Sequence, residues 1–177
     1  MGLFITIAVV AVLLAVYASW AAGRLDRLHA RVDAAGAALE DQLKVRAAAA
    51  EELATQRRVP APVAMELARA AAKARLATGL DHDREVIESA LSRALQEACA
   101  TFEHGSVATA TAVDASTRAA FARRFHNDAV RDALVVRRRW VVRLLHLAGH
   151  APRPAYFEIA DAPLEFADVA AAAAPYD

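Results

Sequence analysis

The chain has 177 residues, equal numbers of acidic and basic side chains, and a 57% hydrophobic content in which alanine predominates, followed by leucine and valine. Its single cysteine excludes an internal disulfide, and its zero net charge does not favour binding to nucleic acid. The length suits one domain with a modest core, and the shortage of aromatic residues favours closely packed helices. We therefore expect an all-α fold.

Residues 1–23 carry no acidic or basic side chain, and the stretch 3–22 is apolar apart from Thr6 and Ser19. About 20 helical residues cross a hydrocarbon core of about 30 Å, so the segment 1–23 is predicted to be a transmembrane anchor. The alternative is a cleaved secretory signal, which would have a positive region followed by a shorter apolar stretch of about 7–15 residues. The length of the apolar stretch favours the anchor.

Arg24, Arg27 and Arg31 follow the apolar segment directly. Positive charge beside a span is usually retained in the cytoplasm. We therefore expect a single-pass protein of the inner cell membrane, with a short N-terminus outside and the bulk of the chain cytoplasmic. Tyr17 and Trp20 near the inner end of the span suit interfacial anchors, although they fit an ordinary span equally well.

The region 24–58 is predicted to be one helix that continues from the span. It contains no proline, and Pro60 and Pro62 follow it. Its apolar residues recur at steps of three and four, which places them on one stripe. These residues are Leu25, Leu28, Val32, Ala35, Leu39, Leu43, Ala47 and Ala50.

Two shorter helices are predicted next. The first covers 63–78 and ends at Gly79, because glycine readily adopts the left-handed conformation that terminates helices. The second begins at a cap provided by Asp81 or Asp83 and runs to about Phe102. Its expected inner face consists of Val86, Ile87, Ala90, Leu91, Ala94, Leu95 and Ala98.

A last long helix is predicted from Asp114 or Ser116 to Ala148, after a loop or helical end over 107–113. Its expected inward residues are Phe121, Phe125, Ala129, Val136, Trp140, Leu144 and Leu147. Residues 151–177 are expected to be an extended, partly mobile tail. The region 24–150 would then be an antiparallel bundle of three to four helices, two of them long.

Several motifs occur in a characteristic order. They are the N-terminal span, Arg31-Val32-Asp33, Asp41-Gln42-Leu43-Lys44 with Arg46, the run Ala122-Arg123-Arg124-Phe125-His126-Asn127-Asp128-Ala129-Val130-Arg131-Asp132, and Pro154-Ala155-Tyr156-Phe157-Glu158. Together they resemble the LemA family. The resemblance covers about residues 1–58 and 116–160. It implies a membrane-anchored helical bundle of uncertain molecular function, with no established cofactor or reaction.

The sequence also departs from this family, which makes it a divergent member by resemblance. Ala133-Leu134 replaces a Tyr-Asn pair, and Trp140-Val141 replaces a Phe-Pro pair. Gly36 stands where family members usually carry a Trp. The run 49–52 stands where they carry Leu-Ile-Pro-Asn.

We predict no catalytic, cofactor-binding or metal-binding site. His146 and His150 are spaced as ligands on one helix, but Gly149 separates them and no carboxylate or cysteine is near. Cys99 lacks a neighbouring base and is interpreted as a packing residue. His82 sits between two aspartates that suit a helix cap better than a metal.

The polar residues of the last helix are the more informative candidates. Asn127, Asp128 and Arg131 lie in the middle of that helix, where short polar side chains compete with the backbone and need a reason to be present. We expect Asn127 to bond to Gln42 or Arg46 and fix the register of the two long helices. Ligand binding by this polar group is the alternative.

Arginines cluster on the segment 135–147. Arg138, Arg139 and Arg143 with Trp140 could face anionic lipid. The alternative is a core helix whose arginines face water or the acidic helix. The expected partners are membrane lipid through one span, an unknown protein and a second copy of the chain, without nucleic acid. The expected function is a non-enzymatic scaffold or interaction module, with a lipid-organising or signal-transmitting protein as the alternative.

Overall fold

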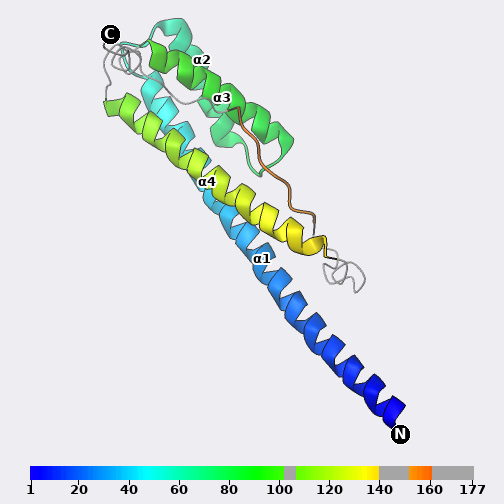
Figure 1. Ribbon diagram of the computed structural model, residues 1–177. Coiled ribbons are helices and arrows are strands. Elements are labelled where there is room, and N and C mark those ends of the chain that lie inside the picture. The colour runs from blue at the N-terminus through cyan, green and yellow to red at the C-terminus, as the bar shows by residue number, and fades with distance from the viewer. Residues whose placement is uncertain (102–106, 140–151, 161–177) are drawn as a thin grey trace, which may run out of the picture. The chain divides into compact units, whose positions relative to one another are not determined.

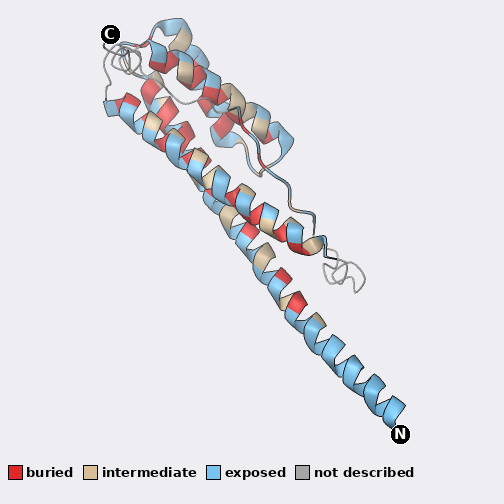
Figure 2. Cartoon of the chain, in the orientation of Figure 1, coloured by how far each residue is buried: buried red, intermediate tan, exposed pale blue. Residues whose placement is uncertain are grey.

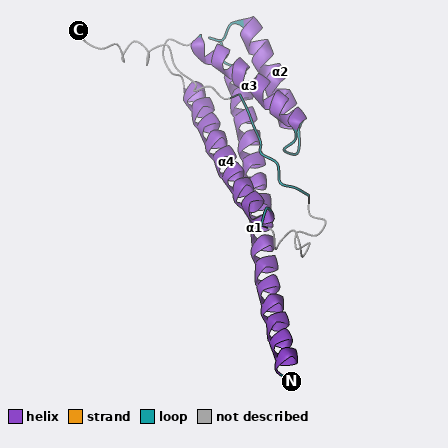
Figure 3. Ribbon diagram, turned by 45° about the vertical axis from the view of Figure 1, so that its right-hand side comes forward, coloured by secondary structure: helices purple, strands orange, loops and turns teal. Residues whose placement is uncertain are grey.

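The computed structural model describes residues 1–101, 107–139 and 152–160. All regular structure in these ranges is helical, in α1 (Gly2–Ala54), α2 (Ala61–Leu76), α3 (His82–Ala100) and α4 (Val107–Arg137) (Figures 1 and 3). The predictions of an all-α chain and of one long apolar N-terminal helix are confirmed. The chain divides into unit 1, Met1–Ala35 with His126–Tyr156, and unit 2, Gly36–Phe125 with Phe157–Asp177.

The start of α4 differs from the prediction. The stretch 107–113, expected to be a loop or a helical end, is helical, so α4 begins at Val107 and not near Asp114 or Ser116. Ala108 and Ala112 are buried in the core, and tertiary packing overrides weak local preference. α4 ends at Arg137, and Arg138 and Arg139 are not helical, so the predicted unbroken helix to Ala148 is wrong at these two residues. The rest of the predicted stretch, 140–148, lies outside the described residues.

The ends of the short helices follow from local chemistry. Pro62 lies in the first turn of α2, where a missing backbone N–H costs nothing. Gly79 has a φ of 80° in the turn that follows α2. The carboxylate of Asp81 accepts a hydrogen bond from the Arg84 backbone N–H at 2.9 Å, so Asp81 is the cap of α3.

The hydrophobic core of unit 2 draws on all four helices. α1 contributes residues between Ala47 and Leu53, and α2 and α3 pack against each other. Most core side chains are alanine, which allows helices to approach closely. The remaining buried members include Leu53, Val59, Leu67, Leu91, Leu95 and Cys99.

The buried stripe of α4 in unit 2 is made of small residues. Ala108, Ala112, Ala115 and Ala119 are buried and follow one another at alternating steps of four and three. This is the seven-residue period of helices packed side by side. The predicted inward residues Phe121 and Phe125 are instead exposed.

Their exposure has a geometric cause. Phe121 and Phe125 have exposed fractions of 52% and 67%. Each step of four residues along a helix moves the side chain about 40° around the helix axis. Residues that follow one another only at steps of four therefore move away from the buried stripe, which has a seven-residue period. The predicted inward residues Ala129 and Val136 are buried, and Trp140, Leu144 and Leu147 are outside the described residues.

Unit 1 pairs the first part of α1 with the last part of α4 in antiparallel directions. Leu25 packs with Val136, while Val32, later on α1, packs with Ala129 and Ala133, which come earlier on α4. Residue numbers therefore rise on one helix as they fall on the other. The part of α1 that lies between the chain's N-terminus and this pairing carries almost only exposed residues (Figure 2).

The described part of the expected tail, residues 152–160, has no regular structure. Its last residues alternate, with Phe157 and Ile159 buried beside Leu39 and Leu43 of α1 in unit 2. The backbone N–H of Ala160 also donates to Ser89 Oγ at 3.1 Å. This end of the tail is therefore part of the core.

The small-residue stripe leads to a test with a matched control. Replacing buried Ala112 with Leu should lower the free energy of unfolding by about 1–3 kcal/mol, because an overpacked core must shift its helices. Ala110 is exposed on the same helix, and Ala110→Leu should change that free energy by less than about 0.5 kcal/mol. Urea unfolding of the detergent-solubilised chain, followed by circular dichroism, measures both. Equal effects would contradict the assigned face of α4.

Candidate functional site

The first part of α1 exposes a continuous apolar surface. Nearly every large side chain from Leu3 to Val16 is exposed, and none of the residues in its most apolar window is buried. α1 is the one helix of the described residues that is long and apolar enough to cross a membrane. A core helix of a soluble protein would bury this surface, because exposed apolar area in water is unfavourable.

Aromatic and basic side chains mark the end of this apolar stretch. The rings of Tyr17 and Trp20 lie 6.0 Å apart, and the guanidinium of Arg24 lies 5.9 Å from the Trp20 ring centre. A guanidinium over an indole face is a cation–π contact. These three residues give α1 an amphipathic end of the kind that sits at a membrane–water interface.

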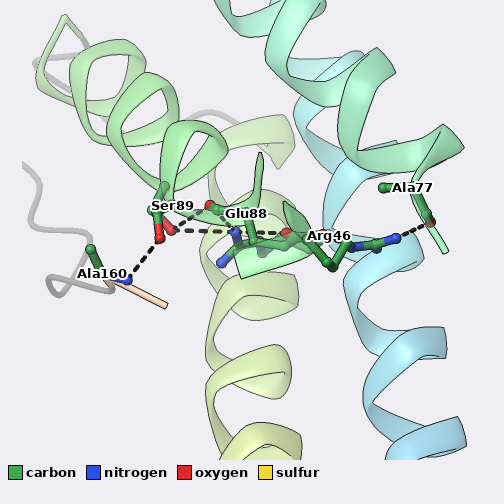
Figure 4. A network of polar contacts seen from close by, with 7 residues as sticks. Arg46, Ala77, Glu88, Ser89 and Ala160 are labelled. Atoms are coloured by element: carbon green, nitrogen blue, oxygen red, sulfur yellow. Dashed lines mark hydrogen bonds and ion pairs between the residues drawn. The ribbon is translucent and has the colours of Figure 1, made fainter. Parts of the chain in front are cut away.

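Unit 2 contains a buried network of charged side chains (Figure 4). Arg46 on α1 and Arg84 and Glu88 on α3 have exposed fractions of 2%, 1% and 0%. Arg46 Nη2 lies 3.0 Å from Glu88 Oε2, and Arg84 Nε lies 2.8 Å from Glu88 Oε1. One carboxylate thus bonds two guanidiniums from two helices.

Backbone and hydroxyl groups complete this network. Arg46 Nη2 donates to the Glu88 carbonyl at 2.8 Å and to Ser92 Oγ at 3.3 Å. Arg84 Nη1 donates to the carbonyl of Ala77, just after α2. Burial raises the pKa of the Glu88 carboxyl, while Arg46 and Arg84 oppose this rise. The network therefore joins α1, α3 and the α2–α3 turn.

The predicted register residues are placed as follows. Arg46 is part of the buried network, whereas Gln42 is half-buried and its Oε1 has no hydrogen-bond partner among the described residues. Asn127 is half-buried in unit 1, and Asp128 forms an exposed ion pair with Arg131 at 3.0 Å. The bond from Asn127 to Gln42 or Arg46 stays a prediction.

His126, in unit 1, is a buried residue that sequence reasoning passed over. Burial lowers the pKa of its imidazole, and a hydrogen bond with the backbone of Ala155 partly offsets this effect. Its Nδ1 atom has no hydrogen-bond partner among the described residues. The available signal was its position seven residues after Ala119 and three before Ala129, on the buried stripe of α4.

Phe121 and Phe125 form an exposed aromatic pair one turn apart on α4. The guanidinium of Arg124 lies 5.8 Å from the centre of the Phe121 ring. Aromatic residues, phenylalanine among them, and arginine are enriched in protein–protein interfaces. This surface, Phe121 with Arg124 and Phe125, is called the aromatic face below.

Possible metal ligands and the single cysteine are the remaining chemical candidates. No group of three or more His, Cys, Asp or Glu side chains is placed to hold a metal ion within the described ranges. Cys99 is buried, and burial raises the pKa of its thiol, which disfavours the reactive thiolate. His146 and His150 are outside the described residues.

Two of the four predicted lipid-facing residues are described by the structure, and two are not. Arg138 and Arg139 are exposed at the end of α4. Trp140 and Arg143 lie outside the described residues.

Sequence reasoning missed Arg84 and Glu88, although a signal was present. Arg84, Glu88, Leu91, Leu95 and Ala98 follow one another at alternating steps of four and three, and all are buried. The expected stripe ran through Val86 and Ile87 because apolar character defined it; Val86 is exposed and Ile87 is only half-buried.

The buried network gives a direct prediction for stability. Glu88→Gln should lower the free energy of unfolding by about 3–5 kcal/mol, because two buried guanidiniums lose the carboxylate that they share. Glu66 pairs with Arg69 at 3.2 Å on the surface, so Glu66→Gln should cost less than about 1 kcal/mol. Urea unfolding of the full-length chain in detergent measures both variants.

A further variant of the same network separates charge from packing. Replacing Arg46, Arg84 and Glu88 together by Met, Leu and Leu should restore most of the stability, because no charge is then buried. A loss as large as that of Glu88→Gln would contradict this account.

His126 predicts a pH dependence. The imidazole has a lowered pKa in the folded chain, so below about pH 6.5 the unfolded chain binds more protons and stability falls as the pH falls. His126→Gln should make the urea midpoint flatter between about pH 7.5 and about pH 5. Unchanged pH dependence in His126→Gln would refute the assignment.

Comparisons of the chain with models of protein families, with curated proteins and with solved structures find no match. The resemblance to the LemA family stays a prediction from the motifs of this sequence.

Proposed function

We propose that this chain is a membrane-anchored helical protein with a non-enzymatic role as a scaffold or interaction module. The observation that carries the proposal is the exposed apolar stretch of α1, which ends at Tyr17, Trp20 and Arg24 and continues as a helix with buried residues. Such a surface fits a lipid bilayer. Arg24, Arg27 and Arg31 favour a cytoplasmic location for the part that follows.

The aromatic face supports the interaction role. Phe121 and Phe125 are exposed although α4 offers a buried stripe, and Arg124 contacts one of the rings. A protein partner that covers this surface would remove apolar area from water and retain the cation–π contact. The motif that contains these residues, 122–132, also carries the proposed resemblance to the LemA family.

A second candidate function is signal transmission through α1. The observation that favours it is the continuity of this helix from Gly2 to Ala54, including Gly23 at the end of the apolar stretch. Two glycines inserted after Gly23 would weaken the helix there. A transmitter would lose its output in this variant, whereas a scaffold would keep its partner.

Site-specific photo-cross-linking in intact membranes tests the interaction role. p-Benzoylphenylalanine replaces Phe125 in the full-length chain with a C-terminal tag, and the purified adducts are identified by mass spectrometry. We expect a stoichiometric adduct with a different protein, because an interface buries its aromatic residues. The control places the same photoreactive residue at Ala110, which is exposed on the same helix but lies outside the aromatic face.

The outcomes separate the roles. Equal adducts from positions 110 and 125, or none from position 125, would refute the aromatic face as an interface. Adducts with the chain itself alone would replace the scaffold with a homo-oligomer. Release of the chain from membranes by alkaline carbonate would refute the anchor.

A further inference from the structure

Six arginines from distant parts of the sequence lie in unit 1. Arg24, Arg27 and Arg31 follow the apolar stretch on α1. Arg137 is the last residue of α4, and Arg138 and Arg139 follow it directly. The first set was expected to flank the membrane from sequence alone. The second set is more than 100 residues away along the chain.

Contacts within unit 1 bring the two sets to the same level. Arg31 Nη1 lies 3.3 Å from Asp132 Oδ2, and Arg137 Nη1 lies 3.3 Å from His29 Nε2. Leu25 and Val136 share one apolar cluster. The end of α4 therefore lies beside α1 just after its apolar stretch (Figure 1).

Most of these arginines are available to a ligand. Arg31 is paired with Asp132, and Arg137 donates to the Pro152 carbonyl at 2.9 Å. Arg27, Arg138 and Arg139 are exposed and form no ion pair with any described residue. Arg24 is exposed beside the Trp20 ring.

We propose that these six arginines, the basic collar, bind the phosphate headgroups of anionic phospholipids around the end of the apolar stretch. This inference rests on the membrane anchorage proposed above. Guanidiniums bind phosphate oxygens through paired hydrogen bonds, and basic residues beside a span are attracted to the anionic surface of a cytoplasmic leaflet. The collar lies next to the apolar stretch that would enter the bilayer, which favours lipid over soluble nucleic acid.

Trp20 provides a local probe of the lipid around the collar. The chain has two tryptophans, so Trp140→Phe leaves Trp20 as the single reporter. The full-length protein is reconstituted into vesicles of phosphatidylcholine and phosphatidylglycerol, with bromine on the acyl chains of one lipid or the other at the same mole fraction. Bromine quenches indole fluorescence at contact, so the ratio of the two quenching efficiencies reports which lipid surrounds Trp20.

We expect brominated phosphatidylglycerol to quench Trp20 about threefold more strongly than brominated phosphatidylcholine. The preference should fall towards one in Arg27→Gln/Arg138→Gln/Arg139→Gln. The matched control is Arg57→Gln/Arg58→Gln/Arg93→Gln, which removes three exposed arginines of unit 2 and should keep the preference. Arg24 is left in place because it contacts the reporter ring. High salt should weaken the preference, since it screens exposed charges.

The results distinguish the collar from the anchor. Equal quenching by both lipids, or a preference that persists in the collar variant, overturns the lipid proposal while quenching itself still demonstrates anchorage. Absence of quenching by either lipid, with release of the chain by alkaline carbonate, overturns the anchorage as well. Equal loss of preference in the unit 2 control would assign the effect to overall charge and would also refute the collar.

Discussion

The structure of unit 2 depends on a single buried carboxylate between two guanidiniums. Glu88 bonds Arg46 of α1 and Arg84 of α3, and all three side chains are almost completely shielded from water. A shift of α1 by one turn against α3 would separate these groups and leave charge buried without a partner, which is strongly unfavourable. The surrounding core consists largely of alanine, whose small side chains define register less sharply than interlocking large ones. The network therefore supplies specificity that the apolar core lacks.

Alanine also explains how the two long helices pack. On α4 the buried positions follow a seven-residue period, with Ala108, Ala112, Ala115 and Ala119 in unit 2 and Ala129, Ala133 and Val136 in unit 1. Each alanine buries little area, so stability must come from many close contacts rather than from a few large side chains. The large side chains Phe121 and Phe125 do not take part in this packing and are exposed to solvent. Their exposure is the reason to propose that a partner covers them.

The sequence predicts helices well here and their faces less well. Prolines, glycine, the Asp81 cap and apolar periodicity are local signals, and they place α1, α2 and α3 to within a few residues. Faces depend on the neighbours. Hydrophobicity favoured Phe121 over Ala119, but close helix packing selects the smaller residue. Glu88 and Arg84 were missed because charged residues are ordinarily exposed, and burial is tolerable here because the Glu88 carboxylate pairs with both Arg84 and Arg46. The sequence motif pointed to Arg46 as a site residue, but it did not indicate that Glu88 is its partner.

Unit 1 connects the apolar stretch of α1 to the end of α4 through contacts that span most of the sequence. The ion pair of Arg31 with Asp132 and the packing of Leu25 with Val136 hold the run Arg137–Arg139 beside the helix that would enter the bilayer. The Arg137 bond to the Pro152 carbonyl holds the start of the last described segment at the same place. If α1 crosses a membrane, this geometry brings a second segment of the chain to the membrane surface without a second span. Its charge is basic, and the favourable surface for such a segment is one that carries phosphate.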